Sequence, residues 1–87
     1  MIHVFISGSV QGVGFRQFVK SKANKLNVKG WVKNLPDRRV EAMLLGSAEN
    51  LELLIDYCRK GPFLAQVKDL EIEHMPDQEF ETFEIIK

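Results

Sequence analysis

Residues 2–16 read IHVFISGSVQGVGFR and combine a strand pattern, a glycine-rich run and the first residues of a helix. Every second residue from Ile2 to Ile6 is aliphatic, and this period of two predicts a half-buried strand over Ile2–Ser7. The run that follows has no acidic residue and no proline before Arg16, and it contains three glycines, Gly8, Gly12 and Gly14. The stretch therefore predicts a strand that opens, through a flexible loop, onto a helix.

Downstream of the loop, apolar residues spaced three and four apart predict an amphipathic helix over residues 15–26. Asn27 follows it, and asparagine readily adopts the left-handed conformation that ends helices. Two β-rich stretches, 28–34 and 39–45, flank a turn at 35–38 and predict a hairpin.

The second half repeats the order of helix and strand. Ser47 is placed to cap a second helix, which ends at Gly61-Pro62. A strand is predicted over residues 65–74, where the apolar positions change parity after Val67 and indicate a bulge, and a short last strand covers residues 83–86.

The order of elements is β-α-β-β-α-β plus a short terminal strand. This order predicts an α+β, ferredoxin-like α/β sandwich, in which two helices cover one face of a mostly antiparallel sheet. With 87 residues, we expect one domain spanning residues 1–87. The loop after the first strand then lies at the end of an interior strand, beside a helix N-terminus.

Composition and charge narrow the range of possible functions. Hydrophobic residues make up 45% of the chain and charged residues 28%, typical of a globular domain, and we find no signal peptide or membrane span. The lone Cys58 cannot form an intrachain disulfide, so we expect a cytoplasmic protein. Residues 1–45 contain eight Lys and Arg and two acidic residues, a net charge of +6 that the remainder balances. This asymmetry favours a small anionic ligand over nucleic acid.

The glycine-rich run has two interpretations. It could simply allow a tight turn, or its backbone N–H groups could converge on an anion at the helix N-terminus. Neither the Walker A lysine nor the third glycine of a dinucleotide fingerprint is present. The positive charge of Arg16 in the first helical turn interacts unfavourably, though weakly, with the helix dipole. A bound dianion would explain why an arginine occupies this position.

Four segments together resemble the acylphosphatase family: GSVQGVGFR (8–16), GWVKNLPD (30–37), VEA (40–42) and GPFLAQV (61–67). The resemblance implies hydrolysis of an acyl phosphate to a carboxylate and inorganic phosphate, with no cofactor and no metal. It assigns phosphate-binding and catalysis to Arg16 and the orientation of the attacking water to Asn34. It also implies phosphate-binding by the backbone of the loop, formed by Val10, Gln11, Gly12, Val13, Gly14 and Phe15.

This chemistry suits the residues, because the leaving carboxylate has a pKa near 4 and needs no strong general acid. Alternatives stay open at this point. Asn34 could cap the turn that follows it, and Gln11 could position the loop rather than contact substrate. The domain could also be a non-catalytic module that binds phosphate or carbamoyl phosphate within a larger assembly. For the enzyme we expect a monomer with a small-molecule substrate and no nucleic-acid or membrane partner.

Two turns depart from the family's usual pattern. Asn27 and Arg38-Arg39 stand where glycine and small polar residues are common, and Arg38 is strained if its φ is positive. His3 and His74 are predicted to have ordinary surface roles rather than to bind a metal, and Trp31 is predicted to pack on a strand surface.

Overall fold

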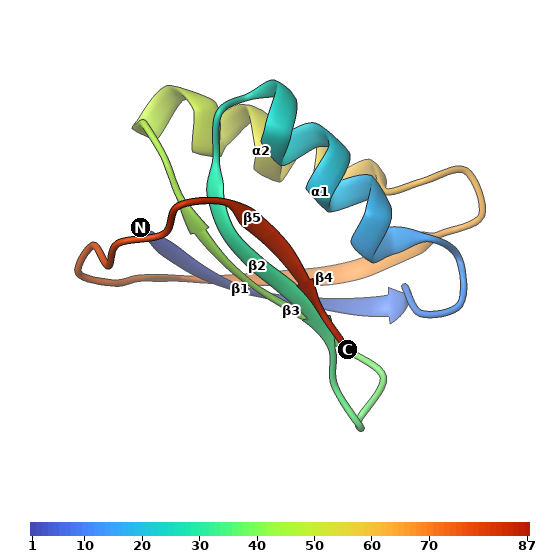
Figure 1. Ribbon diagram of the computed structural model, residues 1–87. Helices are drawn as coiled ribbons and strands as arrows, with labels where there is room; N and C mark the ends of the chain where they lie inside the picture. The colour runs from blue at the N-terminus through green and yellow to red at the C-terminus, as the bar shows by residue number, and fades with distance from the viewer.

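The computed structural model describes all 87 residues and consists of two layers, a five-stranded sheet and two helices that lie on one of its faces (Figure 1). The predicted α+β, ferredoxin-like fold is confirmed. Along the chain the elements are β1 (Ile2–Ser9), α1 (Phe15–Lys25), β2 (Lys29–Asn34), β3 (Val40–Leu45), α2 (Ala48–Lys60), β4 (Gln66–His74) and β5 (Phe83–Ile86).

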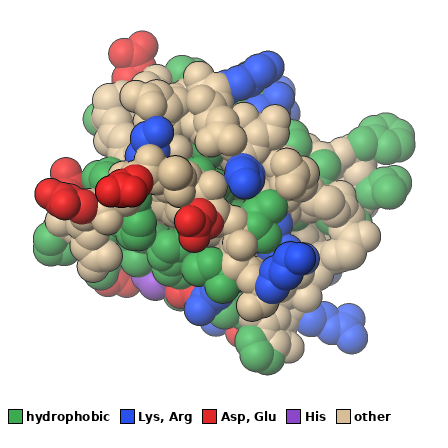
Figure 2. Space-filling view, in the orientation of Figure 1, with side chains coloured by type: hydrophobic (Ala, Val, Ile, Leu, Met, Phe, Trp, Pro, Cys, Tyr) green, Lys and Arg blue, Asp and Glu red, His purple; other side chains and the backbone are tan.

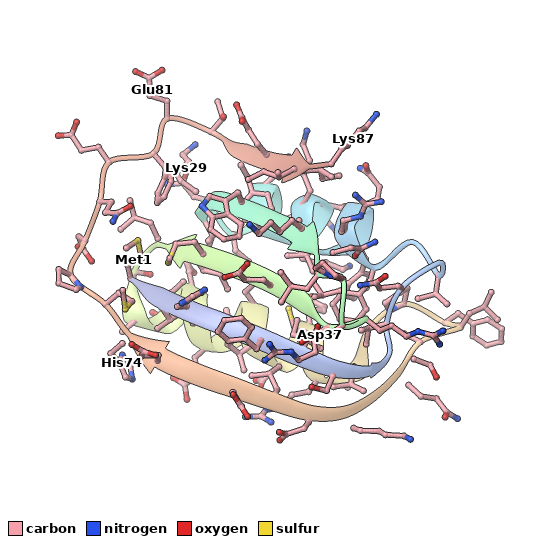
Figure 3. All side chains as sticks on the ribbon, turned by 90° about the horizontal axis from the view of Figure 1, so that it is seen from below. Met1, Lys29, Asp37, His74, Glu81 and Lys87 are labelled. Atoms are coloured by element: carbon pink, nitrogen blue, oxygen red, sulfur yellow. The ribbon has the colours of Figure 1, made fainter.

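The strands lie in the order β4-β1-β3-β2-β5, and every neighbouring pair is antiparallel except β2 and β5. As a result β1, β2 and β5 end, and β3 and β4 begin, at the same end of the sheet. Figure 3 shows Asp37 and Lys87 toward this end and Met1 and His74 toward the other. The loop after β1 therefore lies beside the end of β2, although the two are far apart in sequence.

Several local predictions are confirmed. Asn27 has φ 53° after the end of α1, in the left-handed region, and Ser47 caps α2 by accepting a hydrogen bond from the Asn50 N–H at 3.2 Å. The register shifts between Ser7 and Gly8, whose partners on β4 are Asp69 and Val67, so Lys68 is the extra residue of the predicted bulge.

Boundaries differ from the predictions by one or two residues. The first strand continues to Ser9 rather than ending at Ser7, because residues 8 and 9 still pair with β4 beyond the bulge. The first helix ends at Lys25, and Leu26 is its C-cap. Lys22 is the one charged residue in the apolar stripe of this helix, and it lies at the edge of the core. Its Nζ is 4.6 Å from the centroid of the Tyr57 ring on α2.

The core fills the space between the helices and the sheet. Its members are apolar side chains from β1, β2, β3 and β5, the inner stripes of both helices, and Val10 and Val28 beside them, and no charged or polar side chain is buried among them. Phe15, the first residue of α1, is 2% exposed. Because Phe15 directly precedes Arg16, core packing holds the start of the helix in place.

The other face of the sheet carries no helix (Figure 1). On it His3 is hydrogen-bonded to Glu41 at 2.7 Å, and Trp31 is half-buried beneath the Lys33 ammonium, 5.3 Å away. His74 pairs with Ile2, whose side chain points into the core, so the two histidines lie on neighbouring strands but on opposite faces. Neither helix is long and apolar enough to cross a membrane.

Candidate active site

A hollow of about 280 Å³ lies between the loop after β1, the start of α1 and the ends of β2 and β5. It brings together Arg16 and Asn34, the two residues to which the family resemblance assigns catalytic roles. The hollow is lined by Val10, Gly12, Gly14, Phe15, Arg16, Gln17, Asn34, Ile85 and Lys87.

The loop supplies hydrogen-bond donors. Gly12 and Gly14 have φ values of 74° and 76°, in the left-handed region that glycine adopts at no steric cost. None of the backbone N–H groups of residues 11–14 donates to another backbone group. The first N–H groups of α1, which follow directly, have no partners within a helix either. The loop therefore offers a set of free donors suited to an anion.

Arg16 is the second residue of α1, where the helix dipole disfavours a cation. No acidic residue lies in the first turn of α1, none of the ion pairs involves Arg16, and none of the residues that line the hollow is acidic. The one hydrogen bond of its guanidinium is a long one, from Nη1 to the Ile86 carbonyl at 3.4 Å. The guanidinium is thus held at the hollow with most of its donors free.

The distribution of charge over the molecule agrees with this positive site. Figure 2 shows Lys and Arg side chains around the end of the sheet where the chain terminates, whereas Asp and Glu side chains gather at the opposite end, by the β4–β5 connection. An anionic ligand approaching the hollow therefore meets mostly basic groups.

Asn34 is the last residue of β2, and its Oδ1 is buried without any hydrogen-bond partner. Buried polar atoms of this kind are rare and call for an explanation. The interpretation of Asn34 as a turn cap is wrong, because the turn is closed without its side chain. The Leu35 N–H donates to the Arg39 carbonyl at 2.8 Å, and the Arg39 N–H donates to Asp37 Oδ1 at 3.1 Å. Asn34 instead lines the hollow, with its Oδ1 buried.

Two of the predicted loop residues do not line the hollow. Gln11 turns away from it, and its Nε2 donates to the carbonyls of Leu35 and Arg39, at 2.9 Å each. Val13 packs against the core. The side chain of Gln11 therefore fastens the loop to the hairpin, and only backbone groups of these two residues are available to a ligand.

Three residues of the hollow were not predicted from the sequence: Gln17, Ile85 and Lys87. Gln17 follows Arg16 in the first turn of α1. Its place beside this arginine is the only feature of the sequence that could have indicated Gln17 as a site residue. Ile85 and Lys87 arrive through the parallel pairing of β5 with β2, in which Ile85 lies opposite Val32. No local sequence pattern indicates that pairing.

The hairpin turn beside the loop is built around two arginines. Arg38 has φ 77°, and the backbone strain that was expected for a positive φ at this residue is therefore present. The Arg39 backbone N–H and guanidinium both hydrogen-bond to Asp37 and hold the pKa of that carboxyl below its ordinary value. No cluster of His, Cys, Asp or Glu side chains anywhere in the chain has the arrangement of a metal site.

A two-layer α+β domain with unpaired backbone donors in a loop, a guanidinium without an ion pair and an unpartnered amide oxygen has the features of a small protein that handles phosphate. Comparison with known proteins identifies its family. The Acylphosphatase family model matches residues 2–85. An acylphosphatase of Nitrosococcus oceani is 49% identical over 84 residues, which cover 97% of this chain and 94% of the relative.

Solved structures agree with the sequence match. The crystal structure of the acylphosphatase from Bacillus subtilis superposes with a TM-score of 0.95 at 32% identity, covering 99% of this chain and 97% of that one. Full-length HypF, in its phosphate- and nucleotide-bound form, matches with a TM-score of 0.88 at 28% identity, but the match covers 99% of this chain and only 11% of HypF. The chain belongs to the acylphosphatase family, as the resemblance of its motifs predicted, and the family is one of enzymes.

Proposed function

We propose that the hollow binds the phosphoryl group of an acyl phosphate and catalyses its hydrolysis, with Arg16 and Asn34 as the catalytic residues. One observation supports the proposal above the others: Asn34 lines the same hollow as Arg16 and the loop, and its side-chain Oδ1 is buried without a hydrogen-bond partner. A site that only binds phosphate needs the loop and the arginine. It does not require the amide oxygen of Asn34, whereas hydrolysis requires a group that orients the attacking water.

In the first step the loop holds the substrate. The backbone N–H groups from Val10 to Phe15 donate to the phosphoryl oxygens, and the Arg16 guanidinium binds two of these oxygens at once. The charge on phosphorus-bound oxygens is thereby spread over fixed donors, which is how phosphoryl transfer is commonly stabilised.

In the second step a water attacks phosphorus in line with the bond that breaks. Asn34 Oδ1 accepts a hydrogen bond from this water and orients one of its lone pairs toward phosphorus. The new bond joins the water oxygen to phosphorus, the bond from phosphorus to the acyl oxygen breaks, and the acyl group leaves as a carboxylate. A phosphoryl oxygen takes the proton of the water, so the products are a carboxylate and inorganic phosphate.

None of the side chains that line the hollow is a histidine or a carboxylate, and the leaving group explains why none is needed. A carboxylate with a pKa near 4 departs without being protonated. A neutral amide also suits the position beside a dianion, because a carboxylate there would repel the substrate.

The test is release of phosphate from benzoyl phosphate by the purified protein without added metal. Arg16→Lys should nearly abolish turnover, because an ammonium cannot bind two oxygens in a fork. Lys25→Gln, which removes an exposed cation at the far end of the same helix, is the matched control and should turn over normally. Full activity of Arg16→Lys would contradict the role of the guanidinium.

The match to HypF favours a second candidate, in which the domain binds phosphate or carbamoyl phosphate within a larger assembly and does not turn it over. The same assay separates the two functions. A protein that binds inorganic phosphate by calorimetry but does not hydrolyse benzoyl phosphate would be such a module.

We further propose that residues 1–87 act as one domain and as a monomer in the cytoplasm, with no nucleic-acid partner. The single cysteine, Cys58, is buried and supports a reducing compartment. Light scattering of the purified protein measures the mass of the particle, and a dimer would contradict the monomeric state.

A further inference from the structure

The turn between α2 and β4 carries the two most exposed large apolar side chains of the protein. Phe63 is 99% exposed and Leu64 is 71% exposed, whereas the other large apolar side chains at the surface are 38% to 44% exposed. Neither side chain of this apolar pair packs against the core. A single exposed leucine needs no explanation, but two adjacent large apolar side chains held entirely in water indicate a contact surface.

The backbone holds the apolar pair in a defined turn. The Ala65 N–H donates to the Pro62 carbonyl at 2.9 Å, which closes a four-residue turn with the apolar pair at its centre. At its base, a Cβ built on Gly61 would lie 2.9 Å from the Phe15 ring, so the turn starts in close contact with the core. Figure 1 shows this connection reaching beyond the sheet, at the end where the loop after β1 lies. The apolar pair therefore forms the tip of a fixed projection.

Basic side chains stand on both sides of this tip. Arg59 and Lys60 are the last residues of α2, and Lys68 lies near the start of β4. All three are exposed, none of them forms an ion pair, and residues 57–68 include no acidic residue. Figure 2 shows hydrophobic side chains projecting at this end of the molecule, whereas Asp and Glu side chains gather at the opposite end. The charge around the tip therefore complements an anionic surface.

The convex shape of the tip decides between kinds of partner. A protein would need a pocket that fits both apolar side chains, whereas the hydrocarbon of a lipid bilayer accepts an apolar projection of any shape. Anionic headgroups at the bilayer surface attract nearby lysines and arginines.

From these observations we propose that the α2–β4 turn binds the surface of a membrane that contains anionic lipids. Phe63 and Leu64 enter the outer part of the bilayer, and the three basic side chains contact the headgroups. The expectation of no membrane partner came from the lack of a spanning segment, and a surface contact of this kind needs none. None of these residues lines the active-site hollow, so the inference does not depend on the proposed function.

The experiment measures co-sedimentation of the purified protein with vesicles of phosphatidylcholine, alone or mixed with phosphatidylglycerol. We expect binding to the mixed vesicles that weakens as salt is raised, and little binding to phosphatidylcholine alone. The double variant Phe63→Gln/Leu64→Gln should lower the partition coefficient by about ten-fold or more, because two apolar side chains no longer leave water. Lys60→Gln should lower it by about five-fold.

Two control variants make the same chemical changes elsewhere. Leu53→Gln replaces an exposed leucine in the middle of α2, and Lys25→Gln removes a cation at the far end of α1. Both should bind vesicles as the unaltered protein does. Arg16→Lys should also bind them normally, and the double variant of the turn should hydrolyse benzoyl phosphate normally. The membrane contact and the proposed catalysis can therefore fail separately.

A tryptophan at the tip tests insertion directly. In Trp31→Phe/Phe63→Trp the only indole lies in the turn, and its emission should shift to shorter wavelength when mixed vesicles are added. Equal partition of the unaltered protein and the double variant, or no binding by the unaltered protein, overturns the inference. Binding that inorganic phosphate displaces and Arg16→Lys abolishes would place the headgroups at the hollow instead. A dimer that only the double variant fails to form, without vesicle binding, would show that a second copy covers the tip.

Discussion

The side-chain amide of Gln11 donates to the carbonyl of Leu35 at 2.9 Å, and Leu35 is the residue that follows Asn34. The same nitrogen reaches the Arg39 carbonyl at 2.9 Å on the other side of the turn. One side chain of the loop after β1 thus bridges the two sides of the hairpin turn that follows Asn34. The distance between the loop donors and Asn34 depends on this connection.

Gln11→Met removes the connection while nearly preserving the volume of the side chain. The two carbonyls keep backbone donors, from the N–H groups of Arg38 and Leu35, so we expect a loss of only about 1–2 kcal/mol in the free energy of unfolding. We expect kcat for benzoyl phosphate to fall by more than that loss of stability explains, because Asn34 moves relative to the loop. Urea denaturation and steady-state kinetics measure the two effects, and an unchanged kcat would contradict the positioning role.

Asn34→Ala separates orientation of water from binding of phosphate. If the amide acts on the water, kcat should fall by about 10²–10³, in the range for loss of one positioned polar group, while inhibition by inorganic phosphate stays nearly the same. Asn34→Asp has the same shape and adds a negative charge, so it should also weaken phosphate inhibition. Loss of phosphate binding in Asn34→Ala would place the amide in the anion site instead.

Arg38→Gly tests the strain in the turn. Glycine accepts φ 77° freely but is more flexible in the unfolded chain, so the net gain in the free energy of unfolding should be at most about 1 kcal/mol. For a chain of this size that corresponds to a rise in Tm of up to about 4–8 °C. Arg38→Ala keeps the Cβ and should show no such rise. Equal Tm values for the two variants would show that the turn is not strained.

The pattern of β1 and the end of α1 were predictable because they depend on neighbours along the chain. Aliphatic residues at alternate positions indicate a strand, and Asn27 tolerates the left-handed conformation wherever the helix lies. The role of Asn34 was ambiguous because an asparagine before a turn usually caps it, and only the closed hairpin shows that this turn is made by the backbone and Asp37. The presence of Lys87 at the hollow required the lateral pairing of β5 with β2, which no local pattern encodes.

Cys58 gives a prediction that depends on pH. Burial in the apolar stripe of α2 raises the pKa of its thiol from 9.0 to about 12. At pH 8 the native protein should therefore not react with a thiol reagent such as DTNB, whereas the protein unfolded in urea should react fully. Stability follows the same shift: the unfolded thiol ionises above pH 9 while the folded one stays neutral, so this contribution is complete below pH 9 and is lost as pH rises toward 12. Cys58→Ala should weaken this alkaline loss, and rapid labelling of the native protein at pH 8 would show that the thiol is accessible.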